Sequence, residues 1–179
     1  MNTWGMSVES SSMGLLVARL AIGLLMAAHG AQKLFGWFGG VGPKKAGDAM
    51  AQIGFRPGFA FAVVAGATEF VSGLLVALGL FGPVGPALML SVMIVAIVAV
   101  HWSHGVFAMN NGIELPLLYA VASVVFAGVG YGAHSLDALL NIGGLWSPPL
   151  TWVVLSIGFL GGVANTVIRR PVERHGVQS

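Results

Sequence analysis

Residues 58–107 have the sequence GFAFAVVAGATEFVSGLLVALGLFGPVGPALMLSVMIVAIVAVHWSHGVF, in which Glu69 is the only Asp, Glu, Lys or Arg. A helix needs about 20 predominantly apolar residues to cross the hydrocarbon core of a bilayer. Pro83 and Pro86, close behind Gly79 and Gly82, break this stretch into two runs of that length, because proline does not continue a helix. The stretch therefore predicts a tight hairpin of two membrane-spanning helices, at residues 58–81 and 84–107.

Three further apolar runs extend this pattern over most of the chain. They lie at residues 13–35, 113–131 and 148–168, and the last begins with proline, which the first turn of a helix tolerates. We expect an all-α polytopic membrane helix bundle with four core transmembrane helices in residues 13–137 and a fifth, C-terminal span. Residues 1–12 are predicted to be an N-terminal tail and residues 169–179 a basic tail.

The composition excludes most classes of soluble protein. Of the 179 residues, 56% are apolar and 8% are charged, and the mean hydropathy is +0.89, whereas soluble domains have about a quarter of charged residues. The few basic residues form no stripe, which excludes a nucleic-acid partner. The absence of cysteine excludes disulfides and thiolate metal sites. We find no phosphate loop, nucleophile elbow or histidine–glutamate metal motif, so neither a hydrolase nor a metal site is predicted.

The basic residues predict the orientation of the spans, because short loops rich in Lys and Arg stay in the cytoplasm. The connection at residues 36–57 contains Lys44, Lys45 and Arg56, and the C-terminal tail contains Arg169, Arg170 and Arg174. With five spans, both clusters are cytoplasmic and the N-terminus is outside. Within this connection, apolar residues at helical spacing over residues 44–53 predict a short helix on the membrane surface, with a mobile loop as the alternative.

Small residues recur four positions apart within the predicted spans. Such ridges allow helices to approach closely in lipid, so we interpret them as packing faces. The pairs are Gly14 with Ala18, Gly23 with Ala27, Gly73 with Ala77, and Gly158 with Gly162.

Ionisable residues inside a span are costly unless they face the bundle interior and find partners, so each one is a candidate functional residue. They are Arg19, His29, Lys33, Glu69, His101, His104 and Glu114. From the helical rise per residue, His29 and His101 fall at nearly equal depth and Glu69 near the midplane, within reach of Arg19 or His29. We predict a polar pocket among the first four spans that opens toward the cytoplasm, with Glu69 at its deepest point. Glu69, His29 and His101 are the candidate catalytic residues.

Structural alternatives exist for several members of this set. Arg19 and Lys33 can extend to opposite interfaces, Glu114 can simply begin its helix, and Glu69 can belong to an ion pair that only stabilises the bundle. His29 and His101 have the chemistry of axial haem ligands, but two histidines without an attachment motif are a weak signal, and we disfavour haem.

Several ordered motifs resemble those of the DoxX family. The resemblance covers residues 19–137 and rests on Arg19, Gly23 and the run HGAQKLFGWFGG at residues 29–40, then on Glu69 with Gly73, on residues 96–101, on NGIE at residues 111–114 and on Ser135-Leu136-Asp137. It adds Asp137 to the polar set, and it implies a protein of about four spans in the bacterial plasma membrane. The fifth run and the basic tail depart from that pattern as an extension.

The resemblance implies an association with redox chemistry. The family is named after a membrane subunit associated with an archaeal thiosulfate:quinone oxidoreductase and terminal quinol oxidase, and actinobacterial relatives are linked with complexes that handle thiol and superoxide stress. We expect a membrane subunit of a quinone-linked oxidoreductase, with quinone as the cofactor to test. The alternatives are a transporter-like module for a small solute and a scaffold for soluble partners. Lipid, redox partner proteins and further copies of the chain are compatible partners.

Overall fold

The computed structural model describes residues 8–170, and all of their regular secondary structure is helical. The α-helices are α1 (Val8–Phe35), α2 (Gly42–Gln52), α3 (Gly58–Leu78), α4 (Val84–Val95), α5 (Glu114–Val129), α6 (Leu136–Leu139) and α7 (Pro148–Ile168). A π-helix, η1 (Ala96–His101), continues α4, and three short 3₁₀ turns follow, η2 (Trp102–His104), η3 (Ala108–Asn110) and η4 (Gly143–Leu145). Arg174 of the predicted basic tail lies outside the described residues, as do residues 1–7.

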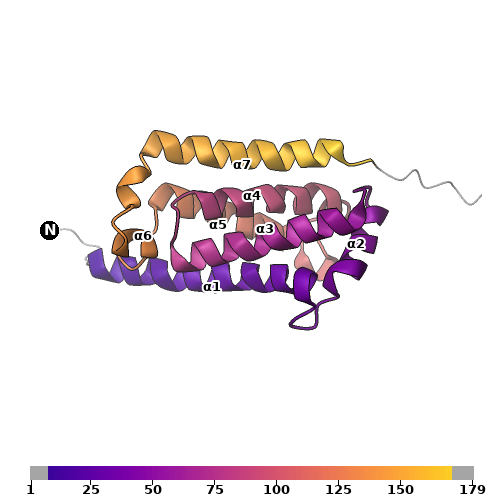
Figure 1. Ribbon diagram of the computed structural model, residues 1–179, viewed down its shortest axis with the longest axis horizontal. Helices are drawn as coiled ribbons and strands as arrows, with labels where there is room; N and C mark the ends of the chain where they lie inside the picture. Colours follow the sequence, from indigo (N-terminus) through magenta and orange to yellow (C-terminus); the bar gives the residue numbers. More distant parts are fainter. Residues whose placement is uncertain (1–7, 171–179) are drawn as a thin grey trace, which may run out of the picture.

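Five long helices lie along a common axis, as Figure 1 shows for α1, α3, α4, α5 and α7. We call one end of this bundle the α2 end, which contains α2 and residues 102–113, and the opposite end the α6 end, which contains α6 and the connection between α3 and α4. Helix α1 begins at the α6 end, and α7 finishes at the α2 end, where the Arg170 backbone N–H donates to the Gly54 carbonyl at 3.0 Å. The described chain therefore begins and ends at opposite ends of the bundle.

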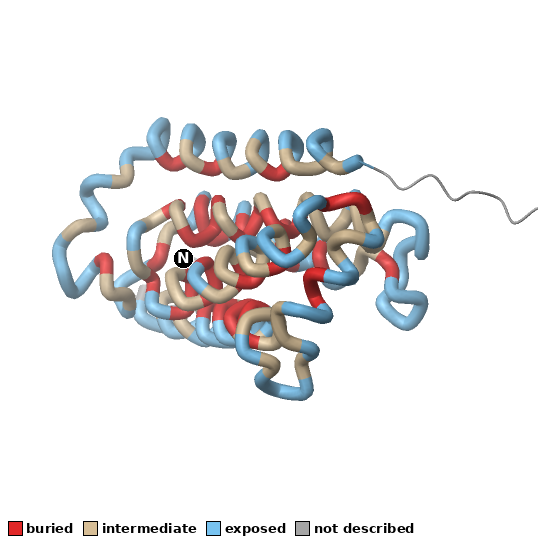
Figure 2. Tube along the Cα trace, turned by 45° about the vertical axis from the view of Figure 1, so that its right-hand side comes forward, coloured by how far each residue is buried: buried red, intermediate tan, exposed pale blue. Residues whose placement is uncertain are grey.

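Within residues 8–170, four helical segments have the length and composition of membrane spans, namely Glu9–Phe35, Gly58–Leu78, Val84–His104 and Pro148–Ile168. Helix α5 is shorter, with 16 residues, which corresponds to about 24 Å. The outward faces are apolar: on α7, Ile157, Phe159 and Leu160 are all at least half exposed, and buried residues of α7 lie only on its bundle side (Figure 2). This surface suits hydrocarbon and not water, so the protein is a multi-pass integral membrane protein.

The helix boundaries differ from the predicted ones for local reasons. Helix α1 begins at Val8 and not at residue 13, with Glu9 in the first turn, where a carboxylate complements the helix dipole. Helix α3 ends at Leu78 because Gly79 adopts a left-handed conformation, with φ of 64°. The third span ends at His104, before Gly105 at φ 80°. The short helix predicted over residues 44–53 is present as α2, which settles the choice between helix and loop.

Small residues set the closest helix contacts. A Cβ atom at Gly23 of α1 would lie 2.6 Å from the Gly73 carbonyl oxygen of α3, and one at Gly162 of α7 would lie 2.7 Å from the Ser91 carbonyl oxygen of α4. The predicted ridge at Gly14 and Ala18 is wrong: both are exposed, and no atom lies within 4 Å of a Cβ at Gly14. These two residues face away from the rest of the bundle, so their small side chains make no helix–helix contact.

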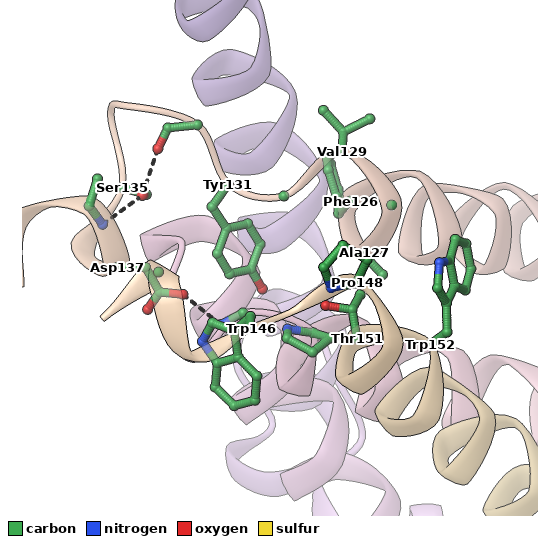
Figure 3. A pocket seen from close by; sticks show the side chains of 17 residues that line it. Phe126, Ala127, Val129, Tyr131, Ser135, Asp137, Trp146, Pro148, Thr151 and Trp152 are labelled. Atoms are coloured by element: carbon green, nitrogen blue, oxygen red, sulfur yellow. Dashed lines mark hydrogen bonds between the residues drawn. The ribbon is translucent and has the colours of Figure 1, made fainter. Parts of the chain in front are cut away.

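The connection between α3 and α4 is a tight hairpin, as predicted, and Asp137 holds it in place. The two carboxylate oxygens of Asp137 accept hydrogen bonds of 2.7 Å from the backbone N–H groups of Phe81 and Gly82. Figure 3 shows one of these bonds as a dashed line at Asp137. Its own N–H donates to the Gly79 carbonyl at 2.9 Å. Such charge-assisted bonds to backbone donors are stronger than neutral ones. Asp137 is therefore a structural capping residue of this turn.

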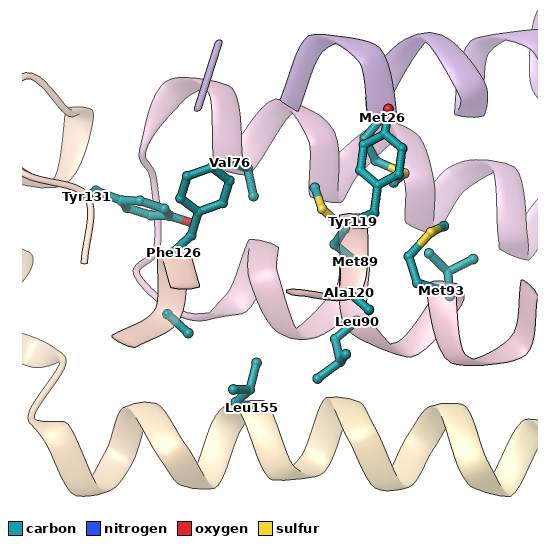
Figure 4. Packing of buried hydrophobic residues seen from close by; sticks show 12 residues of the cluster. Met26, Val76, Met89, Leu90, Met93, Tyr119, Ala120, Phe126, Tyr131 and Leu155 are labelled. Carbon is teal, nitrogen blue, oxygen red and sulfur yellow. The ribbon is translucent and has the colours of Figure 1, made fainter. Parts of the chain in front are cut away.

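The buried core lies midway along the bundle and is apolar. Figure 4 shows Met26 of α1, Val76 of α3, Met89 of α4 and Phe126 of α5 in one cluster, with Leu155 of α7 at its edge. Ser72 and Ser123 are also buried here, and each hydroxyl donates to a carbonyl of its own helix. The centre of the bundle thus carries no charge, and the charged groups lie toward its two ends.

Candidate functional site

Lys33 and Glu69 form an ion pair between α1 and α3 near the α2 end. Lys33 Nζ lies 2.5 Å from both carboxylate oxygens of Glu69, whose residue is only 4% exposed. The two helices are close enough for this pair because Gly30 of α1 packs directly against the backbone of Gly66 and Phe70 in α3. The partner of Glu69 is therefore Lys33, and not Arg19 or His29 as the sequence suggested.

A cavity of about 330 Å³ adjoins this ion pair. Its wall combines ionisable side chains with apolar ones from α1, α3, α4, η1 and α5, the helices of the first four apolar runs. The lining residues are Met26, His29, Lys33, Glu69, Met93, Ala96, His101, Ala108, Asn111, Gly112, Leu115, Pro116 and Tyr119. Four of the eight polar residues singled out in the sequence, His29, Lys33, Glu69 and His101, thus share one cavity.

His101 reaches this wall from the end of the π-helix η1. Its Nδ1 lies 2.6 Å from the Asn111 carbonyl oxygen, which fixes the ring on the connection that leads to α5. The wider turn of a π-helix shifts the residues that follow it relative to an α-helix, and such segments are frequent at functional sites. Arg169, beyond α7, contacts the same segment, since its Nη1 donates to the Ala99 carbonyl at 3.3 Å.

His29 of α1 and Tyr119 of α5 both line the cavity. Their rings meet edge to face with centroids 6.1 Å apart. His29 is exposed on the outer surface of the bundle while Tyr119 is buried. On a spanning helix surrounded by lipid, an exposed residue such as His29 of α1 faces hydrocarbon or the headgroup region. The cavity is therefore bordered by a side that faces the membrane.

His104 and Glu114 are near the α2 end, but neither lines the cavity. Glu114 opens α5, and its carboxylate accepts a 2.7 Å hydrogen bond from the Ala108 N–H. This is the helix-start alternative considered above, with an added cap on the preceding turn. His104 is exposed, and its Nδ1 lies 3.1 Å from the Val100 carbonyl oxygen one turn earlier in the chain.

Arg19 and Asp137 belong to a separate cluster at the α6 end, so the prediction of a single pocket is wrong for these two residues. Arg19 is fully buried, donates from Nη2 to the His134 carbonyl, and lies with Cζ 5.4 Å from the centre of the Tyr131 ring. It is 14 positions before Lys33 on α1, which amounts to about 21 Å. A helical wheel places both on one face of α1 but hides this distance along the axis.

Sequence reasoning missed three of the residues around the cavity, Met26, Met93 and Tyr119. The methionines carry no signal that separates them from other apolar residues of a span. Tyr119 does, because a lone hydroxyl-bearing aromatic in the run LPLLYAVASVVF requires a polar neighbour if it is buried. Figure 4 shows Tyr119 beside Met26, in the part of the core that adjoins the cavity.

The cavity combines proton donors, proton acceptors and apolar contact surface. Imidazole exchanges protons near neutral pH, Glu69 is an acceptor held by Lys33, and Tyr119 brings a phenol group. Methionine and leucine side chains suit an apolar body. This is the general make-up of a small-molecule site, in which a few polar groups orient a mainly apolar ligand.

Comparison with known proteins gives one match. Residues 14–102 match the model of the family described as DoxX. The matched segment contains His29, Lys33, Glu69 and His101, and it ends before α5 and α7. No curated protein and no solved structure matches the chain.

Proposed function

Because the chain belongs to the DoxX family through residues 14–102, we propose that it is the membrane subunit of a quinone-linked oxidoreductase or redox-stress complex. In this proposal, the cavity beside Lys33 and Glu69 holds the headgroup of a quinone. We further propose that the protein lies in a bacterial plasma membrane, with the α2 end toward the cytoplasm and the α6 end outside.

The observation that carries the proposal is the ion pair in the wall of a cavity that also contains apolar contact surface. An ion pair that only joins two helices gains nothing from an adjacent cavity, because close packing would stabilise the same contact. Here a volume of about 330 Å³ lies against Lys33 and Glu69, at the lower end of the range for ligand sites. A quinone ring has two carbonyl oxygens that accept hydrogen bonds, and the Lys33 ammonium and the Tyr119 hydroxyl offer donors within one wall.

The position of the cavity supports a ligand that arrives through the membrane. His29 is exposed on the surface between α1 and α5, which faces lipid in a spanning bundle. A quinone with an isoprenoid tail partitions into hydrocarbon, so a site bordered by lipid admits the headgroup while the tail stays among acyl chains. A water-soluble solute would gain no such route.

The titratable residues suit the protons that accompany quinone chemistry. A quinol that transfers two electrons to a redox partner protein also releases two protons. His29 and His101 are the candidate proton carriers. Glu69 is the candidate proton acceptor, and the Lys33 ammonium group stabilises its carboxylate form. The electrons pass to a partner that contributes its own redox centre, since no cysteine is present in this chain.

The transporter alternative requires a polar path between the two ends of the bundle. Between the cavity and the Arg19 cluster, the core consists of apolar side chains such as Met26, Val76 and Met89. This arrangement favours a local ligand site over a transport path. The scaffold alternative makes a different prediction, namely that changes at Glu69 affect stability alone.

Quinone content tests the proposal. We expect protein purified in mild detergent, extracted with organic solvent and analysed by chromatography to contain quinone in a fixed ratio to protein. The variant in which Lys33→Gln and Glu69→Gln are combined removes both charges of the pair together and should lose the quinone while remaining folded. His104→Ala, which changes an exposed histidine outside the cavity, is the matched control. Quinone at the level of the detergent blank in the unmodified protein would contradict the proposal.

A further inference from the structure

A second cavity lies at the α6 end, away from the Lys33–Glu69 pair. It has a volume of about 300 Å³ and is lined by the α3–α4 connection, the end of α5, the Ser135–Asp137 segment and the start of α7. Figure 3 shows Tyr131, Asp137, Trp146 and Thr151 around it, with the hydroxyl groups of Tyr131 and Thr151 pointing into the same space.

Two residues that line this cavity carry a buried hydrogen-bond donor without a partner. Within residues 8–170, every buried side-chain nitrogen or oxygen that lacks a hydrogen bond belongs to Arg19, Tyr131 or Trp146. The atoms are Nε and Nη1 of Arg19, the hydroxyl of Tyr131 and Nε1 of Trp146. Tyr131 and Trp146 line the cavity, and Tyr131 is only 6% exposed. Native structures contain few such atoms, and each costs free energy unless a partner is supplied.

The chemistry of these donors determines which kind of group can form hydrogen bonds with them. The indole nitrogen of tryptophan and the guanidinium group of arginine donate but do not accept hydrogen bonds. The tyrosine hydroxyl can also donate. The partner that satisfies them is therefore an acceptor, such as a carbonyl oxygen.

The charges around the cavity favour an uncharged acceptor. Arg19 lies behind the Tyr131 ring, and the Asp137 carboxylate is on the same side of the bundle, so charges of both signs lie near the cavity. The Asp137 carboxylate forms part of the cavity wall and would repel an anion. A cation would meet Arg19 close behind the same wall. A neutral ligand avoids both penalties.

The remaining wall suits an apolar or aromatic body. Phe126, Pro148 and Trp152 line the cavity beside the two donors. We propose that this cavity binds the carbonyl group of an uncharged, mainly apolar molecule, with Tyr131 and Trp146 as hydrogen-bond donors. The carbonyl belongs either to the ester of a membrane lipid or to a free ketone or ester. This site does not depend on the quinone proposal, because it shares no residue with the cavity at the α2 end.

Indole N–H signals provide a direct test. The chain has five tryptophans, so protein labelled with ¹⁵N-tryptophan gives a simple spectrum. The protein is kept in a maltoside detergent, which lacks carbonyl groups. The variant Trp146→Phe assigns the signal of Trp146. Acetophenone is the probe, and α-methylstyrene is its matched control, since it has the same shape with a CH₂ group in place of the carbonyl oxygen. We expect acetophenone alone to shift the Trp146 signal downfield in a saturable manner.

Variants then identify the second donor. Tyr131→Phe should weaken acetophenone binding about fivefold to tenfold, the usual effect of one hydrogen bond. Tyr119→Phe, which removes a hydroxyl at the other end of the bundle, should leave it unchanged. Unshifted signals of the other tryptophans show that each variant is folded.

A comparison of lipids separates the two sources of the carbonyl. In nanodiscs made with ester-linked or ether-linked phosphatidylcholine of equal chain length, a Trp146 shift that appears only with the ester lipid assigns the site to lipid. A shift with acetophenone and none between the two lipids assigns it to a free carbonyl compound. The proposal is overturned if acetophenone and α-methylstyrene shift the Trp146 signal equally, or if Tyr131→Phe binds acetophenone as well as the unmodified protein does. It is also overturned if neither acetophenone nor the ester lipid shifts the Trp146 signal, because water is then the partner of these donors.

Discussion

Lys33 on α1 and Glu69 on α3 are joined by a 2.5 Å ion pair that borders a cavity at the α2 end of the bundle. Both charges lie on spanning helices, where each is costly without the other. The pair joins the two helices at the level where Gly30 lets their backbones touch. It also presents a donor and an acceptor to whatever occupies the cavity, so its structural and chemical roles need separate tests.

Removing one member of this pair should be worse than removing both. We expect Glu69→Gln alone to lower the free energy of unfolding by about 3 kcal/mol, because Lys33 is left unpaired beside the core. The double change of Lys33→Gln with Glu69→Gln should recover at least half of that loss. Thermal unfolding in detergent, followed by tryptophan fluorescence, measures both. A double variant no more stable than Glu69→Gln would contradict the assignment of that loss to an unpaired Lys33.

The contact between α1 and α3 should tolerate no side chain at Gly23. A Cβ there would lie 2.6 Å from backbone atoms of α3, so Gly23→Ala should separate the helices and cost about 1–3 kcal/mol. Gly14→Ala is the matched control on the same helix, where a Cβ meets no atom within 4 Å. Equal melting temperatures for the two variants would contradict the packing described for α1 and α3.

Asp137 should control the rigidity of the α3–α4 connection. Asp137→Asn replaces one carboxylate oxygen by an NH₂ group, which cannot accept the hydrogen bond from Phe81 or Gly82. We expect a loss of about 2 kcal/mol, typical of a charge-assisted hydrogen bond. Amide hydrogen exchange of Phe81 and Gly82 should become faster in this variant, and exposed Asp48→Asn on α2 should leave it unchanged. Unaltered exchange in Asp137→Asn would assign the stability of the turn to Pro83 instead.

Helix α5 should cross the membrane although it has only 16 residues. Because the chain lacks cysteine, single cysteines report on accessibility without a background. In intact bacterial cells, Asn141→Cys at the α6 end should react with a membrane-impermeant maleimide, whereas Lys45→Cys on α2 should react only after permeabilisation. Protection of Asn141→Cys in intact cells, with no reaction until the membrane is opened, would show that α5 does not cross or that the orientation is reversed.

Much of the architecture follows from the sequence because lipid imposes simple constraints. Apolar length predicts the spans, and Pro83 and Pro86 predict the hairpin between α3 and α4. The ridges at Gly23, Gly73 and Gly158 predict close helix contacts. In contrast, Gly14 has the same spacing pattern but faces outward, because spacing alone does not indicate which face of a helix meets a neighbour.

The composition of the cavity was harder to predict than its location. Helical periodicity placed Arg19, His29 and Lys33 on one face of α1, but only three-dimensional structure shows that Arg19 belongs to the opposite end. The π-helix at Ala96–His101 has the sequence AIVAVH, in which no residue type predicts a π-helix. His101 owes its place in the cavity wall to that irregular turn and to its contact with Asn111.

The central claim is that a quinone headgroup occupies the cavity beside Lys33 and Glu69, and photoaffinity mapping tests it most directly. Protein in lipid vesicles is irradiated with an azido-quinone, digested and analysed by mass spectrometry. Our account predicts labelling concentrated in the segments of α1 and α5 that line the cavity, around Met26 and Leu115, and suppressed by excess unmodified quinone. Labelling spread over the outward faces of α1 and α7, with no suppression by the competitor, would contradict it.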